Sequence, residues 1–343
     1  MIRRPLFAVA AAGAVVFALA GPALPAQANL IGSGTGAPCF DPVAAGARGG
    51  TSLRAGDTRE ITAAEQLRIE RATARILDTK LVSSLTGLLK GAVASKGKPG
   101  GGGSGGGTDP AGAALGNIPV YVHQMLSKSG AGRVTTQQIN DQIAEMNQDY
   151  AGQDANAHTG STTDQTTKAN TGAHFYLAGV DEYFNDTWHK DRQSTTYRAQ
   201  TRQGGKKSLN IWLVDFSYLG IATFPWDYNA NPSIDGIRVQ WDSLPGGDIT
   251  HYNLGKTATH EAGHWLGLYH TFQGGCTATN DEVADTPAQQ SSTTGCPEGR
   301  DSCTLPGLDP IHNYMDYSYD ECYDEFTPNQ ASRIQSMWTA YRA

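Results

Sequence analysis

The chain has 343 residues, a formal net charge of −7 and 39% hydrophobic residues. This composition is typical of a globular protein with one substantial core plus an appendage, and it excludes a disordered chain. The acidic balance argues against nucleic acid as a partner.

The first 28 residues have the pattern of a secretory signal. Arg3 and Arg4 precede an apolar stretch over residues 6–19, and Ala26-Gln27-Ala28 forms a small-residue cleavage site. We therefore expect a secreted, extracellular protein with no stable membrane association. An uncleaved anchor and twin-arginine export are the alternatives, but the apolar stretch is short for a span and the residues around the arginine pair match poorly.

Residues 29–113 are interpreted as a propeptide. A capping box over residues 62–65 predicts a helix from Ala63 to about Leu77, with a possible continuation toward Leu89. The glycine-rich run 96–108 predicts a flexible linker, and it lacks the G-K-[ST] ending of a phosphate-binding loop. Lys and Arg outnumber Asp and Glu in this segment, whereas acids predominate in residues 114–343. A basic propeptide that lies over an acidic C-terminal domain explains this contrast, and a merely solvated acidic surface explains it equally well.

Residues 114–343 alternate between strand and helix patterns and predict an α+β domain. Apolar periodicity favours a helix with Ile139, Ile143, Met146 and Tyr150 on one face. Strands are expected over four ranges, namely 119–126, 174–178, 209–216 and 236–240.

The most specific motif is H-E-x-x-H-x-x-G-x-x-H, which begins at His260. On a helix over residues 256–266, His260 and His264 project from one face as paired zinc ligands. A continued helix would rotate His270 away from the metal. Gly267 is therefore expected to end the helix and turn the chain back, so that His270 becomes the third zinc ligand.

Glu261 follows the first histidine and lies at the edge of the ligand face. Its carboxylate can take a proton from zinc-bound water, which is the general-base role. The motif thus predicts a zinc-dependent endopeptidase that acts on proteins or peptides. Two alternatives are a secreted zinc-binding module without turnover, which Glu261 disfavours, and an aminopeptidase with a distant glutamate ligand, which His270 makes unnecessary.

A methionine-containing turn, Asn313 to Ser318, follows the zinc motif. Met315 is expected to pack beneath the three imidazoles, and the two motifs together form the metzincin pattern.

A second capping box, Thr327 to Gln330, predicts a closing helix whose buried face carries Ile334, Trp338 and Tyr341.

Four of the five cysteines lie near the C-terminus, and an exported chain with an even cluster predicts two disulfides. They are Cys276, Cys296, Cys303 and Cys322. Their spacing leaves three pairings open and disfavours a zinc ribbon.

Segments flanking the zinc helix make residues from about Ile118 to the C-terminus resemble the pappalysin family of metzincins. They are Tyr252 to Thr257, Thr271 to Cys276, Phe224 to Trp226 and Asp285 to Pro287. The resemblance implies a twisted sheet and active-site helix above a loop-rich, disulfide-linked lower subdomain, with the cleft between them. It also implies the pairings Cys276 with Cys303 and Cys296 with Cys322.

The resemblance assigns further roles around the cleft. Tyr317 would swing toward the reaction intermediate, although a buried structural tyrosine is the alternative. Asp281 and Thr286 would bind calcium, because their loop is rich in hard oxygen donors; a solvated acidic loop is the alternative. Glu321, with Asp320, would select a basic residue after the scissile bond, unless both are merely exposed.

Cys39 is the unpaired cysteine and lies in the expected propeptide. A thiolate is a strong zinc ligand, so Cys39 can hold a latent precursor inactive, as prosegments do in several metzincins. Its context, Gly36 to Phe40, lacks a fuller switch motif. An intermolecular disulfide and a lipidation-like role are the alternatives.

Overall fold

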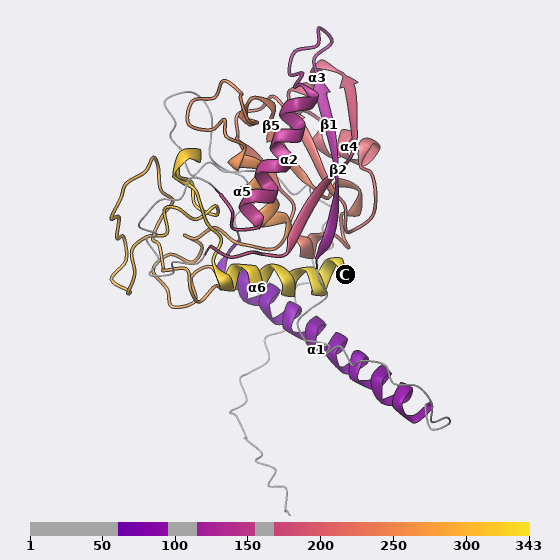
Figure 1. The fold of residues 1–343 in the computed structure, drawn as a ribbon, viewed down its shortest axis with the longest axis vertical. Helices are drawn as coiled ribbons and strands as arrows, with labels where there is room; N and C mark the ends of the chain where they lie inside the picture. Colours follow the sequence, from indigo (N-terminus) through magenta and orange to yellow (C-terminus); the bar gives the residue numbers. More distant parts are fainter. Residues whose placement is uncertain (1–60, 95–114, 155–167) are drawn as a thin grey trace, which may run out of the picture. The chain divides into compact units, whose positions relative to one another are not determined.

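The computed structural model describes residues 61–94, 115–154 and 168–343. The expected signal, Cys39 and the glycine-rich run lie outside the described residues. Within them the domain is built on a five-stranded sheet, flanked by helices and followed by a long irregular segment (Figure 1). An α+β domain was predicted from the sequence, and this is the class observed.

The sheet has the strand order β2-β1-β3-β5-β4. The bounds are β1 Gly116–Leu126, β2 Ala173–Phe184, β3 Leu209–Val214, β4 Gly220–Ala222 and β5 Ile237–Gln240. Strands β2, β1, β3 and β5 are parallel, and β4 runs antiparallel at the edge. Every residue of β3 and β5 is buried, as expected for parallel strands covered on both faces.

Two helices pack on one face of the sheet and against each other. They are α2 Thr136–Tyr150 and α5 Lys256–Trp265, and their apolar side chains share one core with the sheet. Thr135 caps α2 through a reciprocal pair with Gln138. The short helices α3 Asp186–His189 and α4 Ser194–Thr201 follow β2, and Tyr197 of α4 packs with Met125 and Trp212 in a second cluster.

The chain after α5 is mostly irregular and cross-linked. Disulfides join Cys276 to Cys303 and Cys296 to Cys322, as the family resemblance implies. The chain closes with α6 Pro328–Met337 and a π-helical turn, Trp338–Arg342. Single 3₁₀ turns lie at Pro225–Asp227, Pro232–Ile234, Trp241–Ser243 and Asp320–Cys322.

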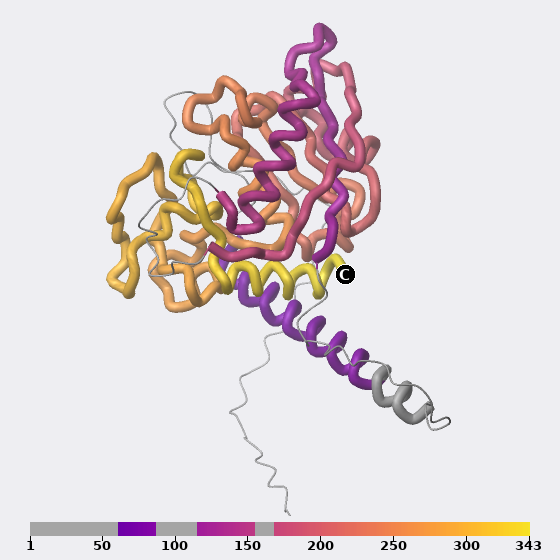
Figure 2. The backbone as a smooth tube through the Cα atoms, viewed as in Figure 1, coloured from indigo at the N-terminus to yellow at the C-terminus, as the bar shows by residue number. Residues whose placement is uncertain are grey.

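A long helix, α1 Ala63–Ala94, precedes the sheet. The backbone trace in Figure 2 shows its first half beside the closing turn of the chain, and the Thr73 hydroxyl lies 2.7 Å from the Tyr341 hydroxyl. Sequence patterns indicated this helix but placed no partner against it.

The observed elements differ from the sequence predictions in several places. The strand expected over residues 209–216 ends at Val214, and the strand expected over 174–178 extends to Phe184. The three-residue strand β4 was not predicted, because so short a segment carries no periodicity. Tyr341 is half-buried, whereas Met337 and Arg342 are buried on the closing segment.

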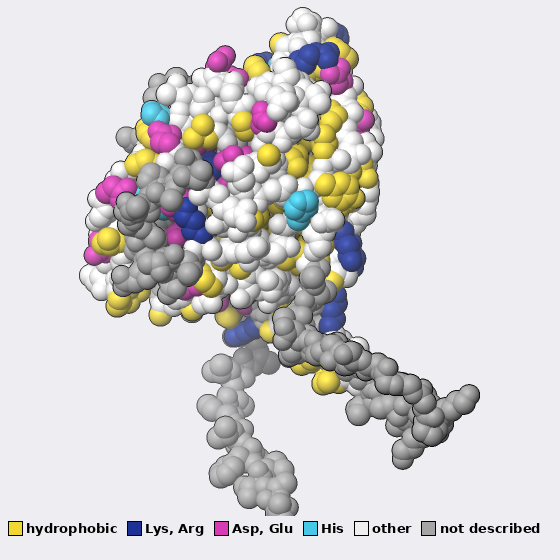
Figure 3. Space-filling model, in the orientation of Figure 1, with side chains coloured by type: hydrophobic (Ala, Val, Ile, Leu, Met, Phe, Trp, Pro, Cys, Tyr) yellow, Lys and Arg dark blue, Asp and Glu magenta, His cyan; other side chains and the backbone are white. Residues whose placement is uncertain are grey.

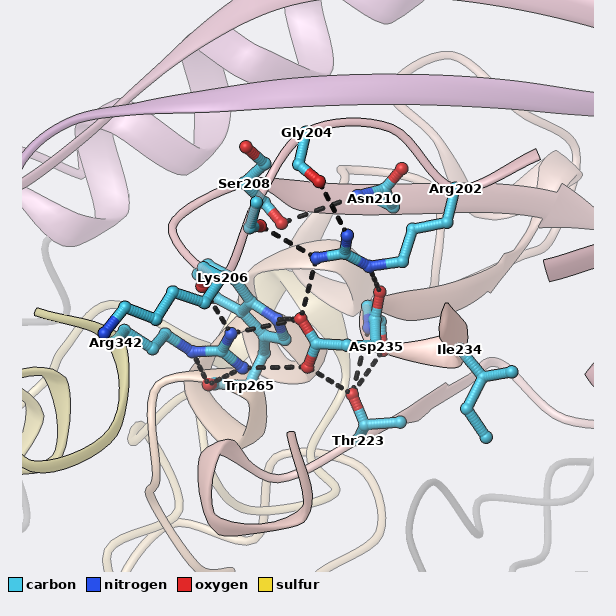
Figure 4. Close-up of polar contacts among 12 residues, drawn as sticks. Arg202, Gly204, Lys206, Ser208, Asn210, Thr223, Ile234, Asp235, Trp265 and Arg342 are labelled. Carbon is cyan, nitrogen blue, oxygen red and sulfur yellow. Dashed lines mark hydrogen bonds and ion pairs between the residues drawn. The ribbon is translucent and has the colours of Figure 1, made fainter. Parts of the chain in front are cut away.

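The C-terminal end of α5 is fixed by a buried ionic network around Asp235 (Figure 4). Arg342 donates from two guanidinium nitrogens to the Asp235 carboxylate at 3.0 and 3.1 Å, and its guanidinium lies 3.6 Å from the centre of the Trp265 ring. The Trp265 indole N–H donates to the same carboxylate at 3.1 Å. Because Trp265 follows His264 directly, this network fixes the helix turn that carries the second histidine.

Candidate active site

Three imidazoles converge at the end of α5. The candidate ligand nitrogens of His260, His264 and His270 lie within 4.8 Å of one another, and the Nε2 atoms of His264 and His270 are 3.0 Å apart. Gly267 has a φ of +103° and follows the last turn of the helix. This left-handed residue reverses the chain, so that His270 returns to the other two rings.

Backbone carbonyls orient two of the three rings. His260 Nδ1 lies 2.5 Å from the Tyr314 carbonyl oxygen, and His264 Nδ1 lies 2.8 Å from that of Leu268. A ring N–H donated to a carbonyl fixes the tautomer in which Nε2 carries the lone pair. Three neutral imidazoles directed at one point fit Zn²⁺ with a fourth position left for water or substrate.

Met315 packs against the helix that carries His260 and His264. Its side chain is fully buried, and its sulfur packs so closely on Gly263 that a Cβ there would collide with it. The Met315 carbonyl accepts a hydrogen bond from the Thr271 N–H at 3.2 Å. The methionine turn is thereby joined to the residue that follows His270.

Glu261 is buried on α5, and its carboxylate lies against Gly220 of the edge strand β4. A Cβ at position 220 would overlap the carboxylate, so glycine is required there for Glu261 to adopt this position. Gly220 has no motif in the sequence and was missed. Only the tertiary fold reveals it, because Gly220 and Glu261 are 41 positions apart in the sequence.

Glu261 and His260 line a cavity under the edge strand. Its other lining residues are Leu219, Gly220, Tyr252, Lys256, Thr257, Asp316, Tyr317, Ser318, Asp320 and Tyr323. The Tyr317 ring lies 4.9 Å from the His270 ring and 5.7 Å from the His260 ring. Tyr317 therefore has access to the point where the three histidines converge.

The two acids expected to select substrate lie in different places. Asp320 is buried and lines the cavity, whereas Glu321 does not line it. Glu321 instead contacts His251 on the surface, with 2.6 Å between its carboxylate and Nδ1. Of the two acids named for substrate selection, Asp320 is therefore the one that faces the cavity.

Asp320 also contacts the start of α5. Its carboxylate accepts a hydrogen bond from the Leu254 N–H at 2.9 Å. Burial raises the pKa of Asp320 to about 7, against the opposing effects of backbone hydrogen bonds and of Lys256. The charge of this cavity wall therefore changes near neutral pH.

Lys256, the first residue of α5, is a buried cation among three acids. Its ammonium donates to Glu145, Asp149 and Asp154 at 2.5 to 2.7 Å. Burial alone would lower the pKa of Lys256, but the charges of Asp149 and Glu145 outweigh it and raise the pKa. The Tyr314 hydroxyl donates to Asp149 at 3.0 Å, which links this cluster to the carbonyl that orients His260.

Gln289 joins the third histidine's loop to the methionine turn. Its side-chain oxygen accepts from the Thr271 hydroxyl at 2.7 Å, and its amide donates to the Asp316 carboxylate at 2.9 Å. Gln289 is fully buried. No motif in the sequence indicated this residue.

In the loop expected to bind calcium, the carboxylate of Asp281 has an unusual environment. Asp281 is buried, and Oδ1 accepts from the Thr286 hydroxyl at 2.7 Å, while Oδ2 has no hydrogen-bond partner among the described residues. Burial raises the pKa of Asp281 to about 8. An orphaned buried carboxylate oxygen beside a hydroxyl fits a hard cation such as Ca²⁺.

Figure 3 shows one face of the molecule. On the described part of this face the Lys and Arg side chains are spread among other types and form no continuous basic patch. Across the described segments, no helix has both the length and the apolar character needed to cross a bilayer.

The chain is similar to proteins that are named extracellular metalloproteases. A family model described as pregnancy-associated plasma protein-A, of peptidase family M43, matches residues 207–339. An extracellular metalloprotease of Neurospora crassa is 43% identical over 235 residues, covering 66% of this chain and 76% of the relative. Another, from Verticillium alfalfae, is 45% identical over 238 residues, covering 66% and 77%.

Two solved structures share the fold. Mature mirolysin of Tannerella forsythia, in complex with a cleaved peptide, has a TM-score of 0.56 at 27% identity and covers 65% of this chain and 91% of that one. A promirolysin mutant has a TM-score of 0.57 at 26% identity, covering 67% and 83%. The chain belongs to the pappalysin family of metzincins, which are zinc metalloendopeptidases.

Proposed function

We propose that this protein is a secreted zinc endopeptidase made as a latent precursor, with His260, His264 and His270 as the zinc ligands. The observation that carries the proposal is the convergence of these three imidazoles at one point, with His260 and the buried Glu261 carboxylate lining one cavity. Zinc, when bound, supplies Lewis-acid polarisation of the scissile carbonyl and lowers the pKa of water.

Glu261 is the general base and acid of this proposal. Its carboxylate takes the proton of the attacking water and returns it to the leaving amine. Burial and the contact with Gly220 restrict the side chain to this position. The Tyr317 hydroxyl, near His260 and His270, stabilises the negative charge that develops on the substrate oxygen.

The edge strand β4 is the proposed docking site for an extended peptide. It ends the sheet and borders the cavity through Gly220, so an extended substrate would pair with its outer edge. Asp320, in the cavity wall, is positioned to select a basic residue after the scissile bond, with Glu321 at the surface in a lesser role.

Calcium is the second proposed cofactor, bound by Asp281 and Thr286. The cation would bind the Asp281 oxygen that has no hydrogen-bond partner within the described ranges, and it would compensate for the burial of the carboxylate charge. This role is structural, because the loop holds neither Glu261 nor a zinc ligand.

Export and latency complete the proposal. The signal-like residues 1–28 and the extracellular relatives support secretion. Residues 29–113 form the prosegment and residues 114–343 the catalytic domain, with Cys39 as the ligand that excludes water from the zinc before maturation. Similarity to a promirolysin supports a precursor form.

One experiment separates this function from its alternatives. Purified mature protein is incubated with a library of peptides with blocked and free ends, with and without a zinc chelator, and the products are sequenced by mass spectrometry. We expect chelator-sensitive cuts at internal bonds. Stepwise removal of N-terminal residues would instead indicate an aminopeptidase, and zinc-loaded protein that cuts nothing would indicate a non-catalytic module.

A further inference from the structure

The first half of α1 is joined to the active-site turn by a buried ion pair. Arg333 of α6 donates to both carboxylate oxygens of Glu70, at 2.6 and 3.1 Å. The Arg333 side chain is only 8% exposed, so the pair is largely shielded from water. The same guanidinium donates through Nε to the Gly267 carbonyl at 3.0 Å.

Glu70 is linked to the third histidine, His270, through the residue before it in the sequence, Tyr269. The Tyr269 hydroxyl donates to Glu70 at 3.1 Å, and the Arg333 guanidinium lies 4.7 Å from the centre of the Tyr269 ring. Tyr269 directly precedes His270. The residues from Gly267 to His270 are therefore held by a carboxylate that belongs to α1.

Apolar contacts continue this interface behind the second histidine. Ile61 and Ile69 are buried against Phe224 and Tyr269. The Phe224 ring in turn lies 5.4 Å from the His264 ring, edge to face. Removal of α1 would expose this cluster to water.

The start of α1 also contacts the loop that follows His270. The buried Gln66 amide donates to the Asn280 carbonyl and to the Glu282 carboxylate, both at 3.0 Å. The Gln273 amide donates to the Ile61 carbonyl at 2.8 Å. These contacts join the start of α1 to the loop proposed to bind calcium and to the chain just before it.

The interface ends near the middle of the helix. Lys80 donates to the Thr339 carbonyl at 2.6 Å, whereas Leu81, Val82 and Leu85 are each more than half exposed. Residues 61–80 thus behave as part of the catalytic fold, and the helix beyond them does not.

We infer that the first half of α1 is a permanent element of the mature enzyme, which positions the turn carrying His270, and is not part of the segment removed on activation. The inference rests on the proposed function. It narrows the removable part of the proposed prosegment, residues 29–113, to the residues before about 60. A cut in the glycine-rich run 96–108 would not by itself release α1 from the catalytic domain.

The wild-type protein provides the first test. The full chain is allowed to mature, the active fraction is isolated by gel filtration in native buffer, and its components are weighed by mass spectrometry after denaturation. We expect residues 61–80 in the active fraction, either joined to the catalytic domain or as a separate fragment. An active, zinc-loaded enzyme that lacks them would overturn the inference and leave the proposed function intact. Retention of α1 in zinc-loaded but inactive protein would support the inference and count against the proposed function.

A matched pair of variants tests the positioning role. Glu70→Gln removes the charge that faces Arg333, and Asp78→Asn changes an exposed acid on the same helix. We expect Glu70→Gln to weaken zinc binding about tenfold or more in chelator competition, with Asp78→Asn unchanged. Equal zinc affinity in the two variants would show that α1 does not position the ligand turn. If Glu70→Gln does not fold, the composition of the wild-type active fraction still decides the inference.

Discussion

Glu261 and the three histidines have separable roles, because ligation and proton transfer need different atoms. Glu261→Gln keeps the size of the side chain against Gly220 and removes its basicity. We expect peptide cleavage to fall by about 10²- to 10⁴-fold with zinc retained at one equivalent, measured by turnover and metal analysis. His264→Ala, as the control, should lose both. Residual turnover above about a hundredth of wild type would remove Glu261 from the base role.

We expect the substrate preference to depend on pH, because Asp320 lines the cavity and changes its charge near neutral pH. Its pKa of about 7 means that the carboxyl is mostly neutral below neutrality and charged above it. Selectivity for Arg or Lys after the cut should therefore rise as pH increases through about 7. In Asp320→Asn, which keeps a carbonyl oxygen for the Leu254 N–H, that rise should be absent.

Cleavage profiles of the peptide library at pH 6 and pH 8 measure this effect. Glu321→Gln is the matched control, because it removes a neighbouring acid that lies outside the cavity. A pH-independent profile in wild type, or the same loss of selectivity in both variants, would contradict the assignment to Asp320.

Single residues were predictable from the sequence where a motif fixes their spacing. The helical interval between His260 and His264, and a glycine at 267, were sufficient to expect three converging rings. Gly220 and Gln289 were not predictable, because each acts on residues distant in the sequence and has no local pattern. Asp320 and Glu321 show a finer limit, since adjacent acids differ in burial only through the tertiary fold.

Among the elements, α5 depends on a buried charge at its start. Lys256→Gln would leave Glu145, Asp149 and Asp154 without their cation. We expect the free energy of unfolding to fall by about 3–5 kcal/mol, the usual cost of breaking a buried ion pair. Urea unfolding measures the loss.

Lys190→Gln is the control for this prediction. Lys190 pairs with Asp215, but the two side chains are 54% and 31% exposed. Its loss should cost no more than about 1 kcal/mol, because water screens a surface pair. Similar losses for the two lysines would show that the acid cluster is not what secures α5.

Helices and strands were predicted well where apolar residues repeat over several turns, as in α2 and the closing helix. The irregular segments were not predicted, because their conformation depends on disulfides and on side-chain hydrogen bonds such as those of Asp281 and Gln289. The helix α1 was predicted from its capping box, but its contacts with Arg333 and Tyr269 depend on residues about 200 or more positions away.

At the scale of the whole molecule, calcium should stabilise the fold without changing its chemistry. Zinc-loaded protein titrated with calcium to millimolar concentrations should show a rising melting temperature, because a ligand that binds only the folded state stabilises it. Asp281→Asn should abolish the rise. No shift in wild type, or an equal shift in Asp281→Asn, would exclude calcium from this loop.

The cysteine proposed to hold the precursor latent, Cys39, lies before the described residues. A Cys39 thiolate bound to zinc would occupy the position that water needs, so Cys39→Ala precursor should cleave peptides, or mature, sooner than wild type. Time courses of both precursors measure this, and a thiol-reactive reagent should release activity from wild type alone. The α1 contacts are expected to persist in both proteins, because Glu70 and Arg333 are unchanged. If both precursors are equally latent and the reagent releases nothing, the prosegment must inhibit through a contact other than a thiolate on zinc.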